Sequence, residues 1–260
     1  MFGNSKKVTR VELVEALQAS VSNDSQLVLL ETKDYDEMIN VLSEAFLEDP
    51  LATWVAGLNE GASDETKKRE LQVKSNECMN AWTNRPILVR KKGAALGIKD
   101  SAGVFLAGVM TLVPGHTKTD GFWDIVTTLI AAGSPPFMTK EKINYGVHAD
   151  KRLVSLEALT KRKMKLMKDE TRYIYVQTLG VMSEHQGKGY GGKLLRKILD
   201  IADSMGAILY LETESKSNES LYHHFGFETV ETMDLQGKGD TTNTKLTMWI
   251  MLRRPKVLRA

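Results

Sequence analysis

The sequence predicts a single α/β (α+β) domain in which helices flank a β-sheet. The clearest sign is a strand, a glycine loop and a helix in succession. Tyr173–Val181 is rich in β-branched and aromatic residues, four glycines follow it, and an apolar stripe at helical spacing runs over Leu194–Met205. Gly103–Val113 is almost continuously apolar, which is typical of a strand buried on both faces. Phe227–Leu235 and Lys245–Arg253 form a predicted β-hairpin, so part of the sheet is antiparallel.

The composition is that of an ordinary globular protein. The chain has 260 residues, of which 42% are hydrophobic and 26% charged, and its net charge is +2. No dense basic tail exists, so we expect no nucleic-acid partner. The single cysteine, Cys78, excludes a disulfide within the chain and is expected to be a small buried hydrophobe. No long apolar run and no secretory signal core is present, so we expect no membrane association and a cytoplasmic location.

The first part of the chain is predicted to be helical around one strand. Residues 1–24 form a predicted N-terminal helical extension with a capping box at Thr9–Glu12, and residues 25–260 form the main domain. Gln26–Glu31 is the first predicted strand. A helix follows from Asp34 or Asp36 to Leu47 and is expected to end before Pro50.

A second helix is predicted over about Ser63–Thr83, capped by Ser63 or Asp64, and short strands over Ile87–Lys92 and Ala94–Asp100.

Residues 117–170 are more than a simple connection between two strands requires, and we interpret them as a helical insertion. Phe122–Ala132 predicts one apolar helix and Glu141–Lys168 a second. The second helix ends in a basic run, which favours a solvated face over a site for an acidic partner; the run comprises Lys161, Arg162, Lys163, Lys165 and Lys168. His116 and His148 have no Cys, His or Asp partners at ligand spacing, so no metal site is predicted.

The C-terminal part continues the alternation of strands and helices. Ala207–Thr213 is a predicted strand, Ser217–Phe225 a helix, and Gln236–Asn243 a polar turn between the two final strands. Gly206 stands where a helix C-terminal glycine is expected.

The glycine loop after Val181 predicts an anion site. Glycines allow several backbone N–H groups to approach one ligand, and the first turn of a helix offers free N–H donors and the positive end of its dipole. A phosphate or pyrophosphate fits such a site. Positive side chains strengthen it; these are Lys188, Lys193, Arg196 and Lys197.

Three phosphate-binding patterns compete for this loop. Gly187 to Lys193 matches most of a P-loop, but Leu194 stands where a Mg²⁺-binding hydroxyl is needed. Gly187 to Gly192 also fits the dinucleotide fingerprint, with Glu212 where the ribose-binding acid belongs. Five residues between the strand and the first glycine, and a short remaining chain, weigh against that alternative.

The third pattern fits best. Gln186–Gly191 has the form Q-x-x-G-x-G, and the stretches LGVMSEHQGKGYGGKLL, LYLETESKSNESLYHHFGF and MWIMLRRP occur in this order. Over about Tyr173–Pro255 the sequence resembles GCN5-related N-acetyltransferases (GNAT), in particular enzymes of the puromycin N-acetyltransferase type. The resemblance implies a mixed, mostly antiparallel sheet that splays apart between its fourth and fifth strands.

The resemblance also implies acetyl-CoA as co-substrate and a set of residues that hold it. The loop would bind the pyrophosphate, the backbone of the fourth strand would pair with the pantetheine arm as an added strand does, and the next helix would contribute one amide. The implied cofactor-binding residues are Leu179, Gly180, Val181, Gln186, Gly187, Lys188, Gly189, Tyr190, Gly191, Gly192 and Asn218.

For catalysis, the resemblance implies Tyr222 as the general acid, one helical turn after Asn218. The carboxylate that many family members carry on the fourth strand is absent, because Tyr175 and Gln177 occupy that region. Glu212 is the substitute base, and a water chain that carries the proton outward is an equal alternative. Phe46, Trp54 and Trp82 are candidate substrate contacts, although packing roles are the simpler explanation for each.

The predicted activity is therefore acetyl-CoA-dependent N-acetylation of a primary amine on a small molecule, by direct attack on the thioester. A protein N-terminus or lysine is an alternative acceptor, and a non-catalytic acyl-CoA sensor is an alternative of another class. A pocket lined by Trp54, Phe122 or Trp123 would favour the small molecule. The sequence does not indicate the oligomeric state.

Overall fold

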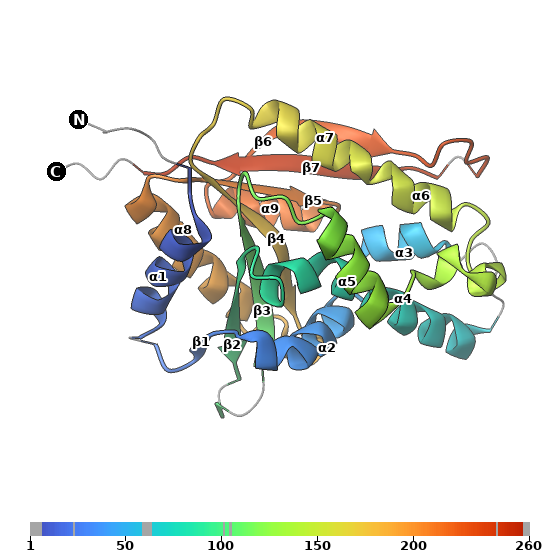
Figure 1. Ribbon diagram of the computed structural model, residues 1–260, viewed down its shortest axis with the longest axis horizontal. Helices are drawn as coiled ribbons and strands as arrows, with labels where there is room; N and C mark the ends of the chain where they lie inside the picture. The colour runs from blue at the N-terminus through green and yellow to red at the C-terminus, as the bar shows by residue number, and fades with distance from the viewer. Residues whose placement is uncertain are drawn as a thin grey trace.

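The computed structural model describes residues 7–22, 24–58, 64–100, 102–103, 106–242 and 244–256, without the side chains at positions 141 and 143. Its strands form one sheet in the order β1-β2-β3-β4-β5-β7-β6 (Figure 1). The strands are β1 (Leu27–Leu29), β2 (Ala94–Lys99), β3 (Leu106–Pro114), β4 (Tyr173–Val181), β5 (Ile208–Thr213), β6 (Glu228–Leu235) and β7 (Leu246–Arg253). The α-helices are α1 (Arg10–Val21), α2 (Tyr35–Ala45), α3 (Pro50–Ala56), α4 (Glu65–Leu88), α5 (Phe122–Ala132), α6 (Ala149–Ser155), α7 (Glu157–Leu166), α8 (Tyr190–Met205) and α9 (Lys216–His224). Short 3-10 helices are η1 (Thr32–Asp34), η3 (Pro136–Met138), η4 (Lys140–Asn144) and η5 (Ser183–His185).

The sheet is antiparallel except at its middle, where β4 and β5 run parallel. This parallel pair is short, joining Tyr173–Tyr175 to Ile208–Tyr210. Beyond Tyr175, β4 continues to Val181 beside β3, but it no longer pairs with β5. The predicted mixed, splayed sheet flanked by helices is confirmed.

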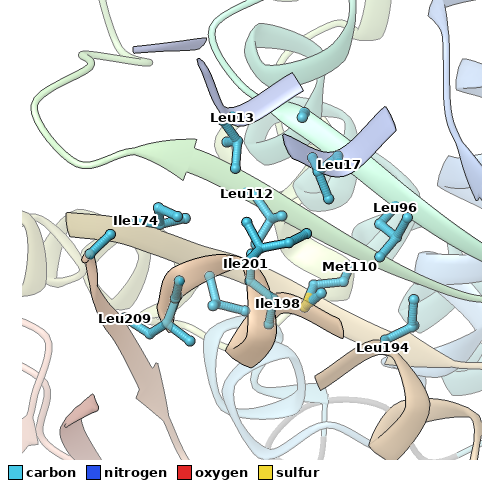
Figure 2. Close-up of a cluster of buried hydrophobic side chains, with 14 of the residues drawn as sticks. Leu13, Leu17, Leu96, Met110, Leu112, Ile174, Leu194, Ile198, Ile201 and Leu209 are labelled. Carbon is cyan, nitrogen blue, oxygen red and sulfur yellow. The ribbon is translucent and has the colours of Figure 1, made fainter. Parts of the chain in front are cut away.

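The core forms around β3, whose nine residues are all buried. One face of the sheet packs against α1 and α8, where Leu13 and Leu17 of α1 meet Leu112 of β3 and Ile198 of α8 (Figure 2). The other face packs against α2, whose Met38 and Leu42 share a cluster with Ala95 and Val109. Because strand side chains alternate between faces, an apolar strand of this length supplies both clusters.

The N-terminal helix is part of this packing. The Thr9 side chain accepts a hydrogen bond from the Glu12 backbone N–H at 3.2 Å, as the predicted cap requires, and Leu13 and Leu17 are fully buried. The other residues of the predicted extension, 1–6 and 23, lie outside the described residues.

The following segment contains one helix that was not predicted and one prediction that is wrong. Helix α2 ends before Pro50 as expected, but Pro50 is also the first residue of α3, where a missing N–H costs nothing, and Asp49 caps that helix by accepting from Ala52 N at 3.0 Å. The predicted strand Ile87–Lys92 is instead the end of α4 and its exit turn, although Pro86 lies inside the helix. Ile87 and Leu88 are buried, and this tertiary packing outweighs the local signal of the proline.

The insertion also differs from its prediction. Phe122–Ala132 is helical as expected, but Glu141–Lys168 is divided into η4, α6 and α7. A buried ion pair fixes the separate α6: Arg152 Nε donates to Asp240 Oδ2 at 2.7 Å, and its NH1 donates to Trp54 O at 2.8 Å. The sequence periodicity carries no sign of these long-range contacts.

Several other predicted bounds touch residues outside the described ranges: Ser63 as a cap, positions 104 and 105 of the central strand, and Asn243 of the final turn. Asp64 is the observed cap of α4, accepting from Thr66 N at 2.9 Å. None of the described helices combines the length and hydropathy of a membrane span.

Candidate active site

The open edge of β4 is the centre of the site. Met182 N donates to Ala107 O at 3.0 Å, and Gly180 stands opposite Val109 in the same ladder. Hydrogen-bonded and non-bonded pairs alternate in an antiparallel ladder, so the backbone groups of Leu179 and Val181 point away from β3. They face the gap that the diverging β5 leaves, where Val181 O accepts a hydrogen bond from the Gln186 side chain. Strand groups without a strand partner can accept an extended ligand.

The glycine loop lies at the end of this edge. After η5, Gly187 has φ 74° and Gly189 has φ 83°, a conformation that L side chains rarely adopt. Gly189 caps α8, whose first residue is Tyr190, so the free N–H groups of the first turn lie beside the loop. The Gln186 side chain donates to Val181 O at 3.1 Å and connects the loop to the strand. Among the predicted loop residues, Gln186 to Gly189 are exposed.

The basic residues near the loop do not all act on it. Lys193 Nζ donates to Asp24 Oδ1 and Gln26 Oε1, both at 2.9 Å, and so holds the segment before β1 against α8. Arg196 lies over the Phe225 ring at 6.0 Å. The expectation that Lys193 adds positive charge at the loop is therefore wrong, because a carboxylate already compensates its charge.

Two cavities meet at the open edge of β4. The first, the cofactor cleft, has a volume of 650 Å³ and includes Gly180, Val181, Gln186 and Gly191 in its lining. The second, the acceptor cavity, has a volume of 290 Å³, and residues of α4, α7 and the junction before α7 contribute to its lining. The residues that line both are Phe46, Asp49, Leu179, Asn218 and Tyr222. The structure thus brings together around one passage the predicted residues Leu179, Gly180, Val181, Gln186, Gly191, Asn218 and Tyr222. The other predicted loop residues line neither cavity; they are Gly187, Lys188, Gly189, Tyr190 and Gly192.

Helix α9 positions Asn218 and Tyr222 at this passage. The Ser215 side chain caps the helix by accepting from Asn218 N at 3.2 Å, which fixes its first turn. Tyr222 follows one turn later and packs edge-on against Phe227, with ring centroids 5.6 Å apart. Burial, with the Glu214 carboxyl nearby, raises the pKa of Tyr222 above its ordinary value. Its hydroxyl is therefore a proton donor at neutral pH.

Glu212 lines the acceptor cavity, but both of its oxygens are engaged. Tyr175 donates its hydroxyl to Oε2 at 2.5 Å, and Tyr210 donates to Oε1 at 2.6 Å. Burial and the Glu212 charge raise the pKa of both tyrosines, which therefore keep their protons. Lys163 Nζ lies 3.7 Å from the centre of the Tyr175 ring.

The position of Lys163 corrects the interpretation of the basic run as a solvated face. Burial lowers the pKa of Lys163, and attraction by Glu212 offsets part of that effect. Arg162 forms an ion pair with Glu231 of β6, and only the remaining lysines of the run face outward without such contacts to the sheet.

The acceptor cavity also contains a pair of acidic residues that the sequence did not predict. The carboxyls of Asp49, at the start of α3, and Glu214, after β5, share a hydrogen bond, and both line the acceptor cavity. Burial and the Asp49 carboxylate raise the pKa of Glu214 to about 9, and burial raises the pKa of Asp49. The pair therefore carries one proton and one negative charge at neutral pH. No local pattern marks it, because its members lie on separate elements.

The aromatic candidates separate clearly. Phe46 lines both cavities, but Trp54 and Trp82 line neither. The Trp82 indole donates to Gly133 O at 2.9 Å and packs against the end of α5. Phe122 and Trp123 are exposed on α5 and do not line the acceptor cavity. The insertion contributes Leu156, Leu159 and Thr160 instead.

No group of three or more side chains suited to a metal ion occurs in the part of the chain that the structure describes. The site is built from backbone groups on one side and carboxyls and phenols on the other. A sheet that opens between two parallel strands beside a glycine loop and a helix N-terminus is the arrangement that the resemblance to acetyltransferases implied.

Comparison with known proteins relates the chain to one family of acetyltransferases. Residues 154–227 match the model of the acetyltransferase (GNAT) family. The chain is 26% identical over 235 residues to the uncharacterized N-acetyltransferase C550.08 of Schizosaccharomyces pombe, covering 87% of this chain and 82% of that protein. The chain is therefore similar to N-acetyltransferases of the GNAT superfamily, and the matched family segment runs from α6 of the insertion to the residue before β6.

A shorter sequence match and a solved structure add to this similarity. The chain is 42% identical over 57 residues to the N-alpha-acetyltransferase RimI of Mycobacterium tuberculosis, covering 21% of this chain and 35% of that enzyme. Arylalkylamine N-acetyltransferase 2 of Aedes aegypti has the same fold, with a TM-score of 0.51 and 14% identity over 88% of this chain and 98% of that one.

Proposed function

We propose that the protein transfers the acetyl group of acetyl-CoA to a primary amine of a small molecule by direct attack on the thioester. The observation that carries the proposal is the meeting of two cavities at the unpaired edge of β4. One cavity has the loop and helix N-terminus that suit a pyrophosphate, and the other is smaller and lined by carboxyls. A thioester at their junction would lie between cofactor and acceptor.

On the cofactor side, backbone groups would hold acetyl-CoA. The glycine loop Gln186–Gly192 and the first turn of α8 would bind the pyrophosphate through N–H groups. The peptide groups of Leu179 and Val181 would pair with the pantetheine arm, and the Asn218 amide would bond to it. The positive φ angles of Gly187 and Gly189, with open space beside both, support this role, because side chains there would enter the space of the anion.

Tyr222 is proposed as the general acid. It lines both cavities and so borders the junction where the thioester sulfur would lie. Its raised pKa keeps the proton on the oxygen until the thiolate departs. When the C–S bond breaks, the proton moves from the phenol to sulfur, and the phenolate takes up a proton from solvent.

The proton of the attacking amine needs an acceptor. Glu212, the base predicted from the sequence, already accepts hydrogen bonds from two tyrosine hydroxyls. These hydrogen bonds reduce its capacity to take a proton from the amine. The Asp49–Glu214 pair carries one negative charge at the junction itself, because Asp49 lines both cavities. We propose that this pair attracts the ammonium form of the acceptor and takes its proton. Glu212 then has a positioning role through Tyr175 and Tyr210.

A protein N-terminus is the second candidate acceptor. The segments shared with RimI of Mycobacterium tuberculosis and with N-alpha-acetyltransferase 50 of Danio rerio favour it, the latter at 32% identity over 63 residues. Each match covers less than two fifths of the curated enzyme, 35% and 38% respectively. The small volume of the acceptor cavity, 290 Å³, supports the small amine, because a peptide substrate needs a longer groove.

Three further features are proposals from the sequence: the relation to enzymes of the puromycin type, the cytoplasmic location, and the division into an N-terminal extension, a main domain and the insertion at about 117–170. The relation to puromycin-type enzymes rests on the motifs from Tyr173 to Pro255.

The proposed acceptor class can be tested by release of free CoA in a panel of small primary amines and of peptides with free N-termini. Turnover of one or more small amines at rates far above every peptide is the expected result. Turnover of peptides alone would assign the second function, and acetyl-CoA binding without turnover of any acceptor would contradict both.

A further inference from the structure

Helix α5 of the insertion has its polar side inward and its apolar side outward. It packs on α4 at the outside of the molecule (Figure 1). Asp124 and Thr128 are its buried residues, with 3% and 0% of their surfaces exposed. In contrast, Phe122 is 72% exposed, Trp123 63% and Ile130 80%. This orientation is the reverse of the usual surface helix, whose apolar face is turned toward the core.

Ion pairs explain why the polar side is buried. The Asp124 carboxylate lies 3.5 Å from Arg90 Nε and 3.6 Å from Lys92 Nζ, both in the turn after α4. It also accepts from the Gly121 backbone N–H at 3.1 Å, which caps the helix. These contacts fix the rotation of α5 about its axis. The apolar side chains then have no face of their own domain to cover them.

The exposed side chains form one continuous stripe. At 100° per residue, the large exposed residues of α5 fall on one side of the helix, opposite Asp124 and Thr128. They are Phe122, Trp123, Ile125, Leu129 and Ile130. Together they expose on the order of 600 Å² of apolar surface, at the upper end for a patch on a monomer. A standard interface buries about 800 Å² on each partner.

We propose that this stripe is the interface of a homodimer, formed by two copies of α5 packed antiparallel about a two-fold axis. The aromatic residues lie at the start of α5 and Ile130 lies near its end. In an isologous contact each aromatic pair therefore meets the aliphatic end of the other copy. Aromatic anchors in an apolar patch are typical of interface centres.

The charge of α5 favours a second copy of this chain, rather than a membrane surface, as the partner of the stripe. Asp124 is the only ionisable side chain of the helix, and it is turned inward. Helices that lie in a membrane interface instead carry lysine or arginine on the polar face, where these side chains reach anionic headgroups. Helix α5 has no lysine or arginine on any face, whereas its apolar stripe can pack against a second copy of itself.

The interface would also support the acceptor cavity, because α5 packs on α4, which supplies Asn76, Met79, Asn80 and Thr83 to the cavity wall. The dimer does not depend on the proposed acetyl transfer, and it can be tested without an acceptor.

Sedimentation velocity of the full chain from 1 to 100 µM, concentrations chosen on the order of ordinary dimer affinities, tests the dimer directly. We expect a dimer for the wild type and a monomer for the double variant Trp123→Ser/Ile130→Ser, with an unchanged circular dichroism spectrum. The matched control is Val11→Ser, which changes a 63% exposed valine on α1 and should leave the dimer intact.

A wild type that stays monomeric over the whole range would overturn the proposal, as would a dimer that survives the double substitution. Flotation with phosphatidylcholine/phosphatidylglycerol vesicles tests a membrane surface as the alternative partner. If the wild type stays monomeric in solution and binds the vesicles, and the double variant does not bind them, the stripe would be assigned to a membrane instead. If the double variant fails to fold, Ile130→Lys alone gives the same decision, because it places a charge at an 80% exposed position.

Discussion

The two sides of the β4 edge are built from different parts of the chain. The predicted cofactor-binding wall of the cofactor cleft is one continuous segment, in which strand β4, the glycine loop and the start of α8 follow one another. Residues from the end of α2 and from α9 complete the cleft. The acceptor cavity combines side chains from the ends of α2 and β5, from α4, and from the insertion. The first side presents mainly backbone N–H and C=O groups, and the second presents carboxyls, phenols and apolar side chains.

This difference indicates which changes each side tolerates. A backbone site depends on φ angles and on the absence of Cβ atoms, so it is sensitive at glycines and tolerant at most other positions. A side-chain site depends on the identity and protonation of a few residues, so conservative substitutions change its chemistry without disturbing the fold. Substitutions on the two sides should therefore have separable effects on cofactor affinity and on turnover.

The largest expected effect is on the backbone side. Gly189→Asp places a side chain at φ 83° and a negative charge where the pyrophosphate would bind, so acetyl-CoA affinity should fall by more than about 100-fold, or about 2.7 kcal/mol. Isothermal titration calorimetry measures it. The matched control is Gly206→Asp, at the other end of α8 with φ 61°, which carries similar strain but should keep the affinity. Equal affinities for Gly189→Asp and the wild type would contradict the pyrophosphate site.

The next effect belongs to the junction. Tyr222→Phe removes the proposed acid without changing the ring packing against Phe227, so kcat should fall by about 10²-fold to 10⁴-fold while acetyl-CoA affinity is retained. Steady-state kinetics with calorimetry separates the two quantities. Tyr35→Phe, which alters a tyrosine beside Arg85 and outside both cavities, serves as the control. Wild-type turnover by Tyr222→Phe would remove the acid role.

A smaller effect distinguishes the two carboxyl sites on the acceptor side. Glu214→Gln removes the shared proton and the coupling to Asp49, so kcat/KM should fall by about 10-fold to 100-fold and the pH profile should change shape. Glu212→Gln keeps an acceptor oxygen for one tyrosine and should lower kcat/KM less, with an unchanged pH profile. The opposite order of effects would restore Glu212 as the base.

The last expected effect is on the free energy of unfolding rather than on activity. The pKa of Glu214 is about 9 in the folded protein, whereas its ordinary value, which applies to the unfolded chain, is 4.5. Between these two pH values the folded protein keeps a proton on Glu214 that the unfolded chain has lost. Stability should therefore decrease from about pH 5 to pH 9, by an amount on the order of 1–3 kcal/mol after relaxation of the site. Thermal melts of Glu214→Gln should lack this decrease. A variant with the same pH dependence as the wild type would show that Glu214 is ionised in the fold.

The sequence predicted the elements of the cofactor side well because their signals are local. β4 has the predicted bounds Tyr173–Val181, and Gly206 ends α8 where a C-terminal glycine was expected. The strand order follows less directly from the sequence. The resemblance implied that β4 and β5 diverge, and the register confirms this divergence, because the two strands pair only over Tyr173–Tyr175 of β4.

The acceptor side was predicted poorly because its signals are not local. Asp49 and Glu214 meet only after the sheet is formed, and neither has a neighbour that marks it as buried. Lys163 looks like one member of a solvated run until α7 packs over Tyr175. The apolar helix Phe122–Ala132 was expected, yet no pattern indicated that its apolar side would face outward, since the ion pairs of Asp124 with Arg90 and Lys92 decide that orientation.

A crystal structure of the protein with acetyl-CoA tests the central claim most directly. We expect the pyrophosphate within hydrogen-bond distance of backbone N–H groups between Gln186 and Gly192, and the pantetheine arm paired with Leu179 and Val181 in the gap between β4 and β5. A cofactor bound elsewhere, or a gap closed by pairing of β4 with β5 beyond Tyr175, would contradict the account.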